Sequence, residues 1–323
     1  MMMIDFVCPA TKSMLSLKND YYISVEGLKY NVVNDIPRFV NQNNYARSFG
    51  LQWNRFRKTQ LDSYSGTTLT EDRLRGICKG NLNVFSGKDV LEIGCGAGRF
   101  TEIMLKYKAK IWSVDLSNAV EANYTNFSHN ANYHVLQADL YSLPFNENCF
   151  DVVTCIGVIQ HTVSPELTIK ELAKYVKPGG ILLIDHYAND YPYTFVRKIF
   201  RKGLFLLPYA MRFPLSKFVV IVLWPFHKIA WRIQQRWIKS NRGERLRKLF
   251  LKLSPVVDYH TVYPALNNTQ LREWAILDTH DTLTDRYKHL RSVKEIENIL
   301  SEIKMTEIDV WKGGNGIEGY AIK

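Results

Sequence analysis

The feature that most constrains this chain is a glycine-rich turn at residues 94–98, which follows an apolar strand and precedes a helix-like stretch. Glycine lets the backbone approach a ligand at positions where a Cβ atom would clash. Gly94, Gly96 and Gly98 have G-x-G-x-G spacing, and Arg99 holds the position that a dinucleotide-binding G-x-G-x-x-G turn reserves for glycine. The turn therefore predicts a ligand-binding α/β sheet and disfavours a pyrophosphate cradle.

From residue 88 onward, short apolar runs alternate with helix-like stretches, a pattern typical of a parallel sheet covered by crossover helices. The predicted strands are 89–93, 110–115, 133–138, 151–157 and 180–186, followed late in the chain by 306–311 and 316–322. The predicted helices are 99–108, 117–127, 165–176 and 292–303, with Ser117 and Ser164 as N-caps and Pro165 at a first helical position. These elements predict a doubly wound, seven-stranded, mostly parallel α/β sheet.

The chain divides into four predicted segments. They are a small N-terminal module (1–43, with strands at 21–25 and 29–33), a sheet core that opens with a helix over 44–63 (44–190), a basic and aromatic helical insertion after the fifth strand (191–265), and the C-terminal part of the core (266–323). The five cysteines include no C-x-x-C pair, so neither a disulfide framework nor a zinc site is indicated. Residues 1–18 lack the apolar run of an export signal, and we expect a cytoplasmic protein.

Two carboxylates follow strands of the predicted sheet. Asp115 ends the second strand about twenty residues after the glycine turn, where a carboxylate can accept hydrogen bonds from both ribose hydroxyls of an adenosine. Asp139 follows the third strand, and Leu140 comes next. Ligands of open α/β sheets bind at the carboxyl ends of the strands, so these residues predict an adenosine site. The alternative for Asp115 is a helix-capping or loop aspartate.

The ordered motifs resemble those of class I S-adenosylmethionine-dependent methyltransferases. They are Glu92-Ile93-Gly94-Cys95-Gly96-Ala97-Gly98, Asp115-Leu116-Ser117, Ala138-Asp139, Phe150-Asp151-Val152-Val153 and Lys177-Pro178-Gly179-Gly180. The resemblance covers about residues 86–190 and 290–323. It implies a Rossmann-like methyltransferase fold, S-adenosylmethionine as cofactor and methyl transfer as the activity.

The resemblance also implies roles for individual residues. The glycines would border the methionine part of the cofactor, Glu92 would hold its ammonium, Asp115 would bind the ribose and Asp139 the adenine amine. Residues 156–161 would line the methyl-transfer face, and a helix around residues 49–56 would cover the site, although an aromatic stripe at this spacing also suits plain packing. The full expected cofactor set is Gln52, Trp53, Glu92, Gly94, Cys95, Gly96, Gly98, Asp115, Leu116, Asp139, Leu140 and Ile156.

Three histidines are candidate catalytic residues, because methylation of a hydroxyl or an acidic carbon needs a base near neutral pH. His161 and His186 follow the fourth and fifth strands, and each has the alternative of lining the pocket without chemistry. His280 belongs to a second ionisable group, whose alternative is a polar loop face. That group comprises Asp258, Tyr259, His260, Asp278, His280 and Asp281.

Two motifs that the sequence lacks limit the class of molecule that could accept the methyl group. Residues 156–159 lack the Asn/Asp-Pro-Pro-aromatic motif of exocyclic base methylation, and Cys155 lies inside an apolar strand where a buried inert thiol is expected. Residues 274–281 resemble a stretch of methyltransferases from surface-sugar and secondary-metabolite pathways. We therefore expect a small-molecule or saccharide acceptor, possibly lipid-linked, with an RNA methyltransferase and a non-catalytic cofactor-binding module as alternatives.

The flanking segments carry two further expectations. Residues 7–11 and 35–39 resemble a zinc-ribbon-like module, but Cys8 is its single cysteine, so no zinc is predicted. Between residues 197 and 252, fifteen Lys and Arg face one acid, Glu244, among many aromatic residues. This composition suits a lid or homodimer surface, peripheral contact with an anionic membrane at its inner face, or RNA. The longest apolar run, 218–226, is too short for a membrane span.

Overall fold

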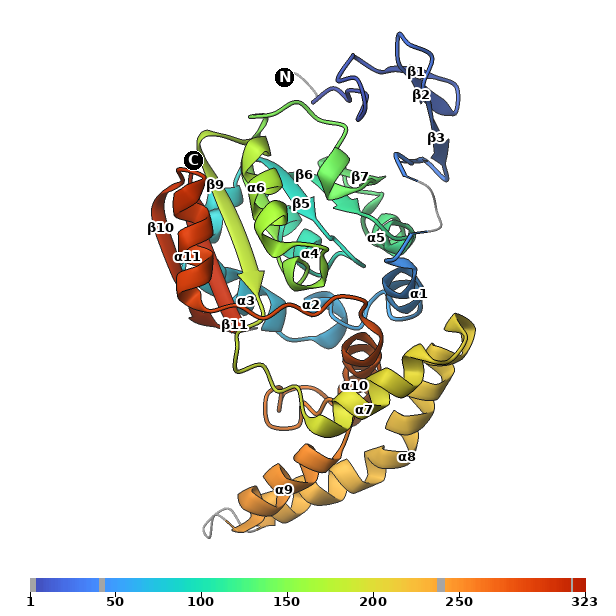
Figure 1. Cartoon of the computed structure of the whole chain (residues 1–323), viewed down its shortest axis with the longest axis vertical. Helices are drawn as coiled ribbons and strands as arrows, with labels where there is room; N and C mark the ends of the chain where they lie inside the picture. The colour runs from blue at the N-terminus through green and yellow to red at the C-terminus, as the bar shows by residue number, and fades with distance from the viewer. Residues whose placement is uncertain (1–3, 41–43, 237–241, 315) are drawn as a thin grey trace. The chain divides into compact units, whose positions relative to one another are not determined.

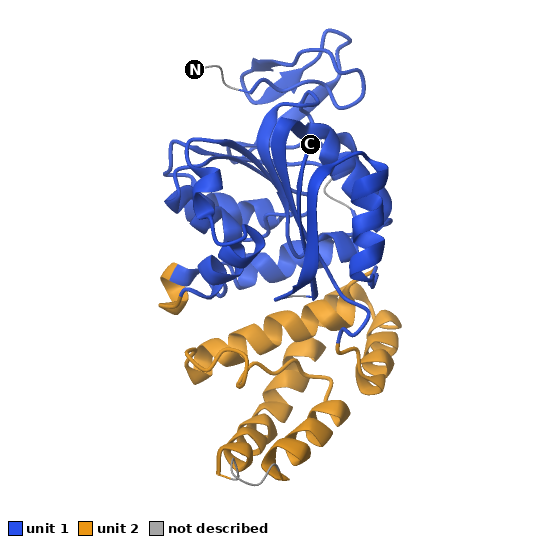
Figure 2. Ribbon diagram, turned by 90° about the vertical axis from the view of Figure 1, so that its left-hand side faces the viewer, with its two compact units in different colours: residues 1–62, 68–191, 287–323 blue, residues 63–67, 192–286 orange. Residues whose placement is uncertain are grey.

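The structure is a computed structural model that describes residues 4–40, 44–236, 242–314 and 316–323. The chain forms two compact units (Figure 2). The sheet unit comprises residues 1–62, 68–191 and 287–323, and the helical unit comprises residues 63–67 and 192–286. The predicted insertion was expected to end at residue 265, whereas the helical unit extends to Arg286.

The sheet unit contains a seven-stranded sheet with the order β10-β11-β9-β8-β5-β6-β7 (Figure 1). Its parallel strands are β5 (Asp89–Ile93), β6 (Lys110–Asp115), β7 (Tyr133–Gln137), β8 (Phe150–Cys155) and β9 (Val176–His186). β10 (Thr306–Gly313) and β11 (Gly316–Ile322) form an antiparallel pair, and β11 runs antiparallel to β9. The predicted doubly wound, mostly parallel sheet is confirmed.

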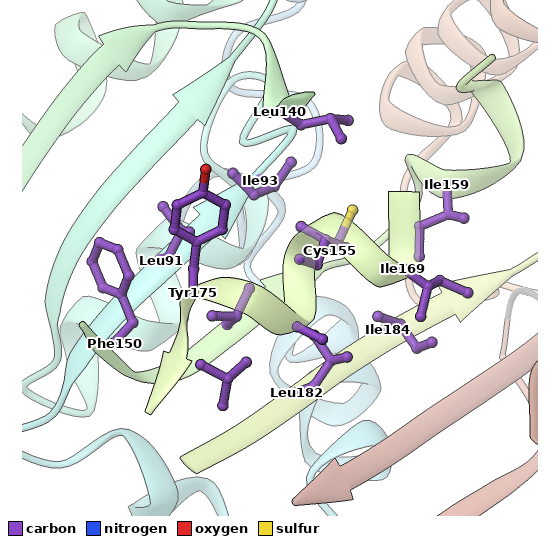
Figure 3. Close-up of a cluster of buried hydrophobic side chains, with 14 of the residues drawn as sticks. Leu91, Ile93, Leu140, Phe150, Cys155, Ile159, Ile169, Tyr175, Leu182 and Ile184 are labelled. Atoms are coloured by element: carbon purple, nitrogen blue, oxygen red, sulfur yellow. The ribbon is translucent and has the colours of Figure 1, made fainter. Parts of the chain in front are cut away.

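The sheet's two faces are both apolar, which is why its strands appear as nearly continuous hydrophobic runs. Figure 3 shows Leu91, Ile93, Cys155 and Ile184 clustered with Ile169 of α6 (Pro165–Tyr175). Adjacent strand residues point to the opposite face of the sheet. Their side chains, such as those of Val90, Val152 and Leu183, pack in a second cluster with residues of α3 (Leu69–Ile77) and α4 (Arg99–Lys106). Each large aliphatic side chain buried in this way contributes about 1.5–3 kcal/mol.

The helices beside the sheet begin close to the predicted residues. Ser164 Oγ accepts from Leu167 N and Pro165 is at the helix start, as predicted. α5 (Ala119–Phe127) begins after Asn118, so the expected N-cap at Ser117 is wrong. The Ser117 hydroxyl donates to Asp115 Oδ1 at 2.7 Å and accepts from Ala119 N, at the start of α5, at 3.1 Å. Further elements are η1 (Leu82–Phe85), η2 (Leu140–Ser142), η3 (Ile159–His161) and α11 (Val293–Glu302).

The N-terminal part of the sheet unit is a small antiparallel sheet of β1 (Ser16–Lys18), β2 (Tyr21–Ile23), β3 (Lys29–Val33) and β4 (Ile36–Pro37). Cys8 Sγ lies 3.3 Å from the Tyr30 hydroxyl. Just after β4, Phe39 N donates to Gln137 O at 2.8 Å, which ties this module to β7. The zinc-ribbon resemblance stays a prediction.

The helical unit contains α7 (Phe195–Phe205), α8 (Tyr209–Arg236), α9 (Arg242–Leu253) and α10 (Asn268–Thr284). Residues 237–241, within the predicted basic insertion, lie outside the described residues. α10 begins with a capping box in which Asn267 and Gln270 bond each other's backbone. The alternative of a polar loop face does not hold for Asp278, His280 and Asp281, since all three lie on α10.

α8 is much longer than the apolar run at its centre. It has 28 residues and continues through Pro214 and Pro225. Among the described helices, α8 alone has the length and apolar composition that a membrane span would need. The expectation that this region is too short therefore underestimated the helix, although length and composition by themselves do not establish a span.

Candidate active site

The glycine turn between β5 and α4 depends on glycine geometry. Gly94 and Gly98 have φ angles of 73° and 95°, in the left-handed region that side-chain-bearing residues rarely adopt. A Cβ on Gly94 would lie 2.1 Å from Val158 Cγ2, and one on Gly98 would lie 2.1 Å from Phe127 Cε2. Val158 belongs to the loop after β8, so the turn is also packed against the segment predicted to line the methyl-transfer face.

Asp115 meets the glycine turn at the carboxyl end of the sheet. Gly96 N donates to Asp115 Oδ2 at 3.0 Å, and Ser117 N donates to Oδ1 at 2.8 Å. Enclosure by the protein raises the pKa of Asp115, while these hydrogen bonds oppose the shift. The two features expected to hold one adenosyl group are therefore in direct contact.

The predicted adenine side is adjacent to Asp115. Ala138 N donates to Asp115 O at 3.2 Å, and Asp139 Oδ1 accepts from Tyr141 N at 3.0 Å. Leu140 is buried in the core cluster, while Leu116 O accepts from Asn44 Nδ2 at 2.7 Å.

Tyr45 also belongs to this side of the site. Burial raises its pKa, and the nearby charges of Asp139 and Asp115 add to the shift. Its ring meets that of Tyr287 edge-on at 5.6 Å. Sequence reasoning identified neither tyrosine, because they come from segments more than 200 residues apart and belong to no motif.

Glu92 is a buried carboxylate with one satisfied oxygen. Its Oε2 accepts from Thr101 Oγ1 at 2.5 Å and from Ser113 Oγ at 2.8 Å, whereas Oε1 has no hydrogen-bond partner among the described residues. Burial raises its pKa to about 7, against the opposing effect of the two hydroxyl donors. An unpaired buried acceptor is costly, so this oxygen fits a cationic ligand such as the ammonium of S-adenosylmethionine.

A helix covers the glycine turn as expected, but it is shorter. The predicted helix over 44–63 separates into α1 (Arg47–Arg55) and α2 (Asp62–Ser65). A Cβ on Gly96 would lie 3.2 Å from atoms of the Trp53 indole, so Trp53 lies against the turn. Gln52 is buried on the same helix. Asn54 Nδ2 donates to Asn118 O at 2.8 Å and holds α1 against the start of α5.

Two expected cofactor residues direct their side chains into packed regions. Cys95 is buried with Val120 and Phe127, and burial raises the pKa of its thiol. Ile156 packs with residues of α3 and α4 in the second core cluster. Both side chains are therefore occupied by packing, and a contact with a cofactor would involve their backbone.

His161 lies in η3 with aromatic rings around it. Its Nδ1 is 3.2 Å from Tyr287 O, and its ring centroid lies 5.6 Å from that of Phe49 and 5.4 Å from that of Tyr187. His289 N donates to Gln160 O at 3.0 Å and so fixes the same loop. His161 thus stands in an aromatic enclosure at the carboxyl end of β8.

His186, at the end of β9, has an unsatisfied ring nitrogen. Its Nδ1 lies 2.8 Å from Tyr187 O, which identifies Nδ1 as the protonated nitrogen. Nε2 is buried without a partner in the described chain, and burial lowers the pKa of His186 to about 4. Both side-chain amide atoms of buried Gln160 are likewise unpartnered there. Sequence reasoning placed Gln160 in the segment expected to line the methyl-transfer face but gave it no individual role.

His280 belongs to a different unit from His161 and His186. It lies on α10 in the helical unit, where its ring meets Phe213 of α8 edge-on at 5.1 Å. Its Nδ1 and Nε2 lie 3.4 Å from the hydroxyls of Ser216 and Thr284. These contacts are those of a core histidine between two helices, and they do not support the predicted catalytic role.

The fold is a Rossmann-like α/β domain, and the candidate site lies at the carboxyl edge of its parallel strands. Residues 91–184 match the family model described as "Methyltransferase domain". This part of the chain is a class I, S-adenosylmethionine-dependent methyltransferase domain.

Individual relatives agree with this class. The chain is 34% identical over 117 residues to a ubiquinone biosynthesis O-methyltransferase of Coxiella burnetii, which corresponds to 34% of this chain and 49% of the relative. It is 29% identical over 108 residues to the protein of the same name from Hydrogenovibrio crunogenus, 32% of this chain and 44% of the relative. The chain thus spans about half the length of these curated relatives. A solved SAM-dependent methyltransferase from Aquifex aeolicus aligns over 87% of this chain and 98% of its own, at 14% identity and a TM-score of 0.43.

Proposed function

We propose that this protein transfers the methyl group of S-adenosylmethionine to a hydroxyl oxygen of a small-molecule acceptor. The observation that carries the proposal is the contact between Gly96 N and Asp115 Oδ2, beside a buried carboxylate at Glu92 that lacks a partner for one oxygen. The O-methyltransferase names of the relatives favour oxygen as the methylated atom. A saccharide hydroxyl, free or lipid-linked, belongs to the same chemical class of acceptor.

Glu92, Asp115 and Asp139 would hold the cofactor. When bound, S-adenosylmethionine supplies an activated methyl group on a sulfonium, so the protein needs little covalent machinery. Glu92 Oε1 would accept hydrogen bonds from the ammonium, the Asp115 carboxylate would accept from the ribose hydroxyls, and Asp139 would accept from the adenine amine. Trp53 on α1 would keep water away from the glycine turn.

His186 would accept the proton of the acceptor hydroxyl. Its neutral ring, with Nδ1 directed at Tyr187 O, leaves the Nε2 lone pair unused until a donor arrives. Gln160 offers unused amide atoms that would orient the acceptor. His161, whose Nδ1 already faces Tyr287 O, would help to form the aromatic enclosure. A base in this role contributes about 10²–10⁴ in rate.

The proposal is tested by methyl transfer from labelled S-adenosylmethionine to a panel of phenols, free saccharides and lipid-linked saccharides. Labelled product with a methyl ether bond, identified by mass spectrometry, is the expected result. His186→Ala should lower turnover by about 100-fold or more while cofactor affinity is retained. Leu167→Ala, on an exposed site of α6, is the matched control. Methyl found on nitrogen or carbon, or full turnover by the His186 variant, would contradict the proposal.

A further inference from the structure

α8 has two apolar faces, and the helical unit uses one of them. The inner face is buried and carries Phe213, Ser216, Val220, Trp224 and His227. Ser216 and His227 form side-chain hydrogen bonds with the rest of the helical unit, to His280 and Asp258. These bonds fix which side of α8 faces inward.

The other side, which we call the outer face of α8, is an exposed apolar stripe. It consists of Leu215, Phe218, Val222, Phe226, Ile229 and Ile233. Their spacing of three and four residues places them on one side of a helix along its length. Single exposed apolar residues are ordinary, whereas a continuous stripe of six marks an interaction surface.

The charges beside the stripe identify the partner. At about 100° per residue, Lys217, Lys228 and Arg232 fall along one flank between the outer and inner faces. Glu244 is the single acid between residues 192 and 253, and it already pairs with Lys248 at 2.6 Å. An apolar stripe bordered by cations is typical of a helix that lies in the interface of an anionic bilayer, with its cations reaching the headgroups.

We propose that the outer face of α8 docks this protein on an anionic lipid membrane, with the helix parallel to the bilayer plane. A spanning helix would have to withdraw Ser216 and His227 from their partners and place them in hydrocarbon, which disfavours a span. A second copy on this face would bring like charges together, and RNA would satisfy the cations while leaving six apolar side chains exposed. The inference does not depend on methyl transfer.

Co-sedimentation of the full chain with vesicles tests the proposal. The chain should bind phosphatidylcholine vesicles that contain phosphatidylglycerol, bind pure phosphatidylcholine weakly, and be released by salt. The double variant Phe218→Glu, Ile229→Glu should bind at least about tenfold more weakly. Leu167→Glu, which places the same charge at a similarly exposed position of α6, should bind like the unmodified chain; Phe218 and Leu167 are 60% and 57% exposed.

A second variant isolates the charge contribution. Replacing Lys217, Lys228 and Arg232 by Gln should weaken binding by about fivefold for each cation removed and flatten its salt dependence. Circular dichroism and thermal unfolding establish that each variant is folded. The proposal is overturned if the chain does not sediment with anionic vesicles or if the double Glu variant binds normally. It is also overturned if that variant instead dissolves a dimer or abolishes RNA retention on a filter.

Discussion

The two units place their unsatisfied groups differently. In the sheet unit, unpaired polar atoms are buried at the carboxyl ends of the strands, on Glu92, His186 and Gln160. The helical unit also has buried polar atoms without a hydrogen-bond partner among the described residues, such as His260 Nε2, but this ring is packed between Asp258 and Trp224. Its conspicuous exposed feature is the apolar outer face of α8. The comparison indicates that the sheet unit is built to receive a polar ligand and the helical unit to receive an apolar surface.

Asp258 organises the interior of the helical unit. Its Oδ1 pairs with Arg247, and its Oδ2 lies 2.6 Å from His227 Nδ1 and 3.1 Å from His260 Nδ1. Burial would raise the pKa of Asp258, but the hydrogen bonds from His227 and His260 and the charge of Arg247 hold it well below the usual range. Ser254 Oγ lies 2.8 Å from His227 Nε2, so both ring nitrogens of His227 have partners inside the helical unit.

The largest expected effect is a loss of helical-unit stability when Asp258 is replaced. Asp258→Ala leaves the Arg247 guanidinium buried without its carboxylate, and we expect a loss of about 3–5 kcal/mol in the unfolding free energy of the helical unit. Urea unfolding followed by tryptophan fluorescence measures the loss, while cofactor binding by the sheet unit should persist. Glu244→Ala, which removes an exposed carboxylate of the same unit, is the control. A variant as stable as the unmodified chain would refute this role for Asp258.

In the sheet unit, the carboxylate whose loss should have the largest effect on cofactor binding is Asp115. Asp115→Ala removes the acceptor proposed for the ribose hydroxyls, and we expect cofactor affinity to fall by about 10- to 100-fold in calorimetric titration. Asp309→Ala, an exposed carboxylate on β10, should bind the cofactor normally. Equal affinities of the two variants would show that the sheet unit does not use Asp115 for this ligand.

The pH dependence of binding separates Glu92 from Asp115. The proposed contact with an ammonium requires ionised Glu92, and the pKa of this group in the unliganded protein is about 7. Cofactor affinity should therefore rise about tenfold between pH 6 and pH 8. The unfolding free energy of the unliganded protein should change in the opposite direction. A carboxyl group whose pKa is raised in the folded state contributes stability at low pH, and this contribution is lost as pH rises through the raised pKa. Glu92→Gln should bind with little pH dependence, and a pH dependence that survives in this variant would exclude Glu92 as its source.

The smallest expected effect is the loss of a helix N-cap, which should lower the stability of one unit and leave the other unchanged. Ser164→Ala removes the N-cap of α6, and it should cost about 1 kcal/mol of sheet-unit stability. Thr194→Ala removes the corresponding cap of α7 in the helical unit. If the two units unfold separately, each variant should shift one transition in thermal unfolding. Identical shifts in both transitions would mean that the units unfold together.

The sheet unit could be predicted from sequence because its signals are local. β5, β6 and β11 have the predicted bounds, since each is an apolar run ended by a turn or a polar residue. Glu92 and Asp115 could be predicted as candidate cofactor-binding residues because they belong to ordered sequence motifs. Tyr45, Tyr187 and Tyr287 could not be predicted, because their approach to the site depends on the loops between elements.

The helical unit was harder to predict for a physical reason. α10 is buried along most of its length and therefore lacks the one-sided pattern that identifies a helix. α8 is apolar on two opposite faces, which also obscures its periodicity. His280 was predicted to be catalytic because several ionisable residues lie close together in this part of the sequence, and the sequence does not show that its side chain is buried on α10. The second apolar face, which hid α8 from sequence reasoning, is the face that we propose docks on a membrane.

The most direct test of the account is a crystal structure of the chain with S-adenosylhomocysteine, the demethylated product of the cofactor. We expect the ribose hydroxyls on the Asp115 carboxylate, the amino group at Glu92 Oε1 and the adenine beside Asp139. A nucleoside bound elsewhere, with Asp115 still occupied by Gly96 N and Ser117 alone, would contradict the proposed site.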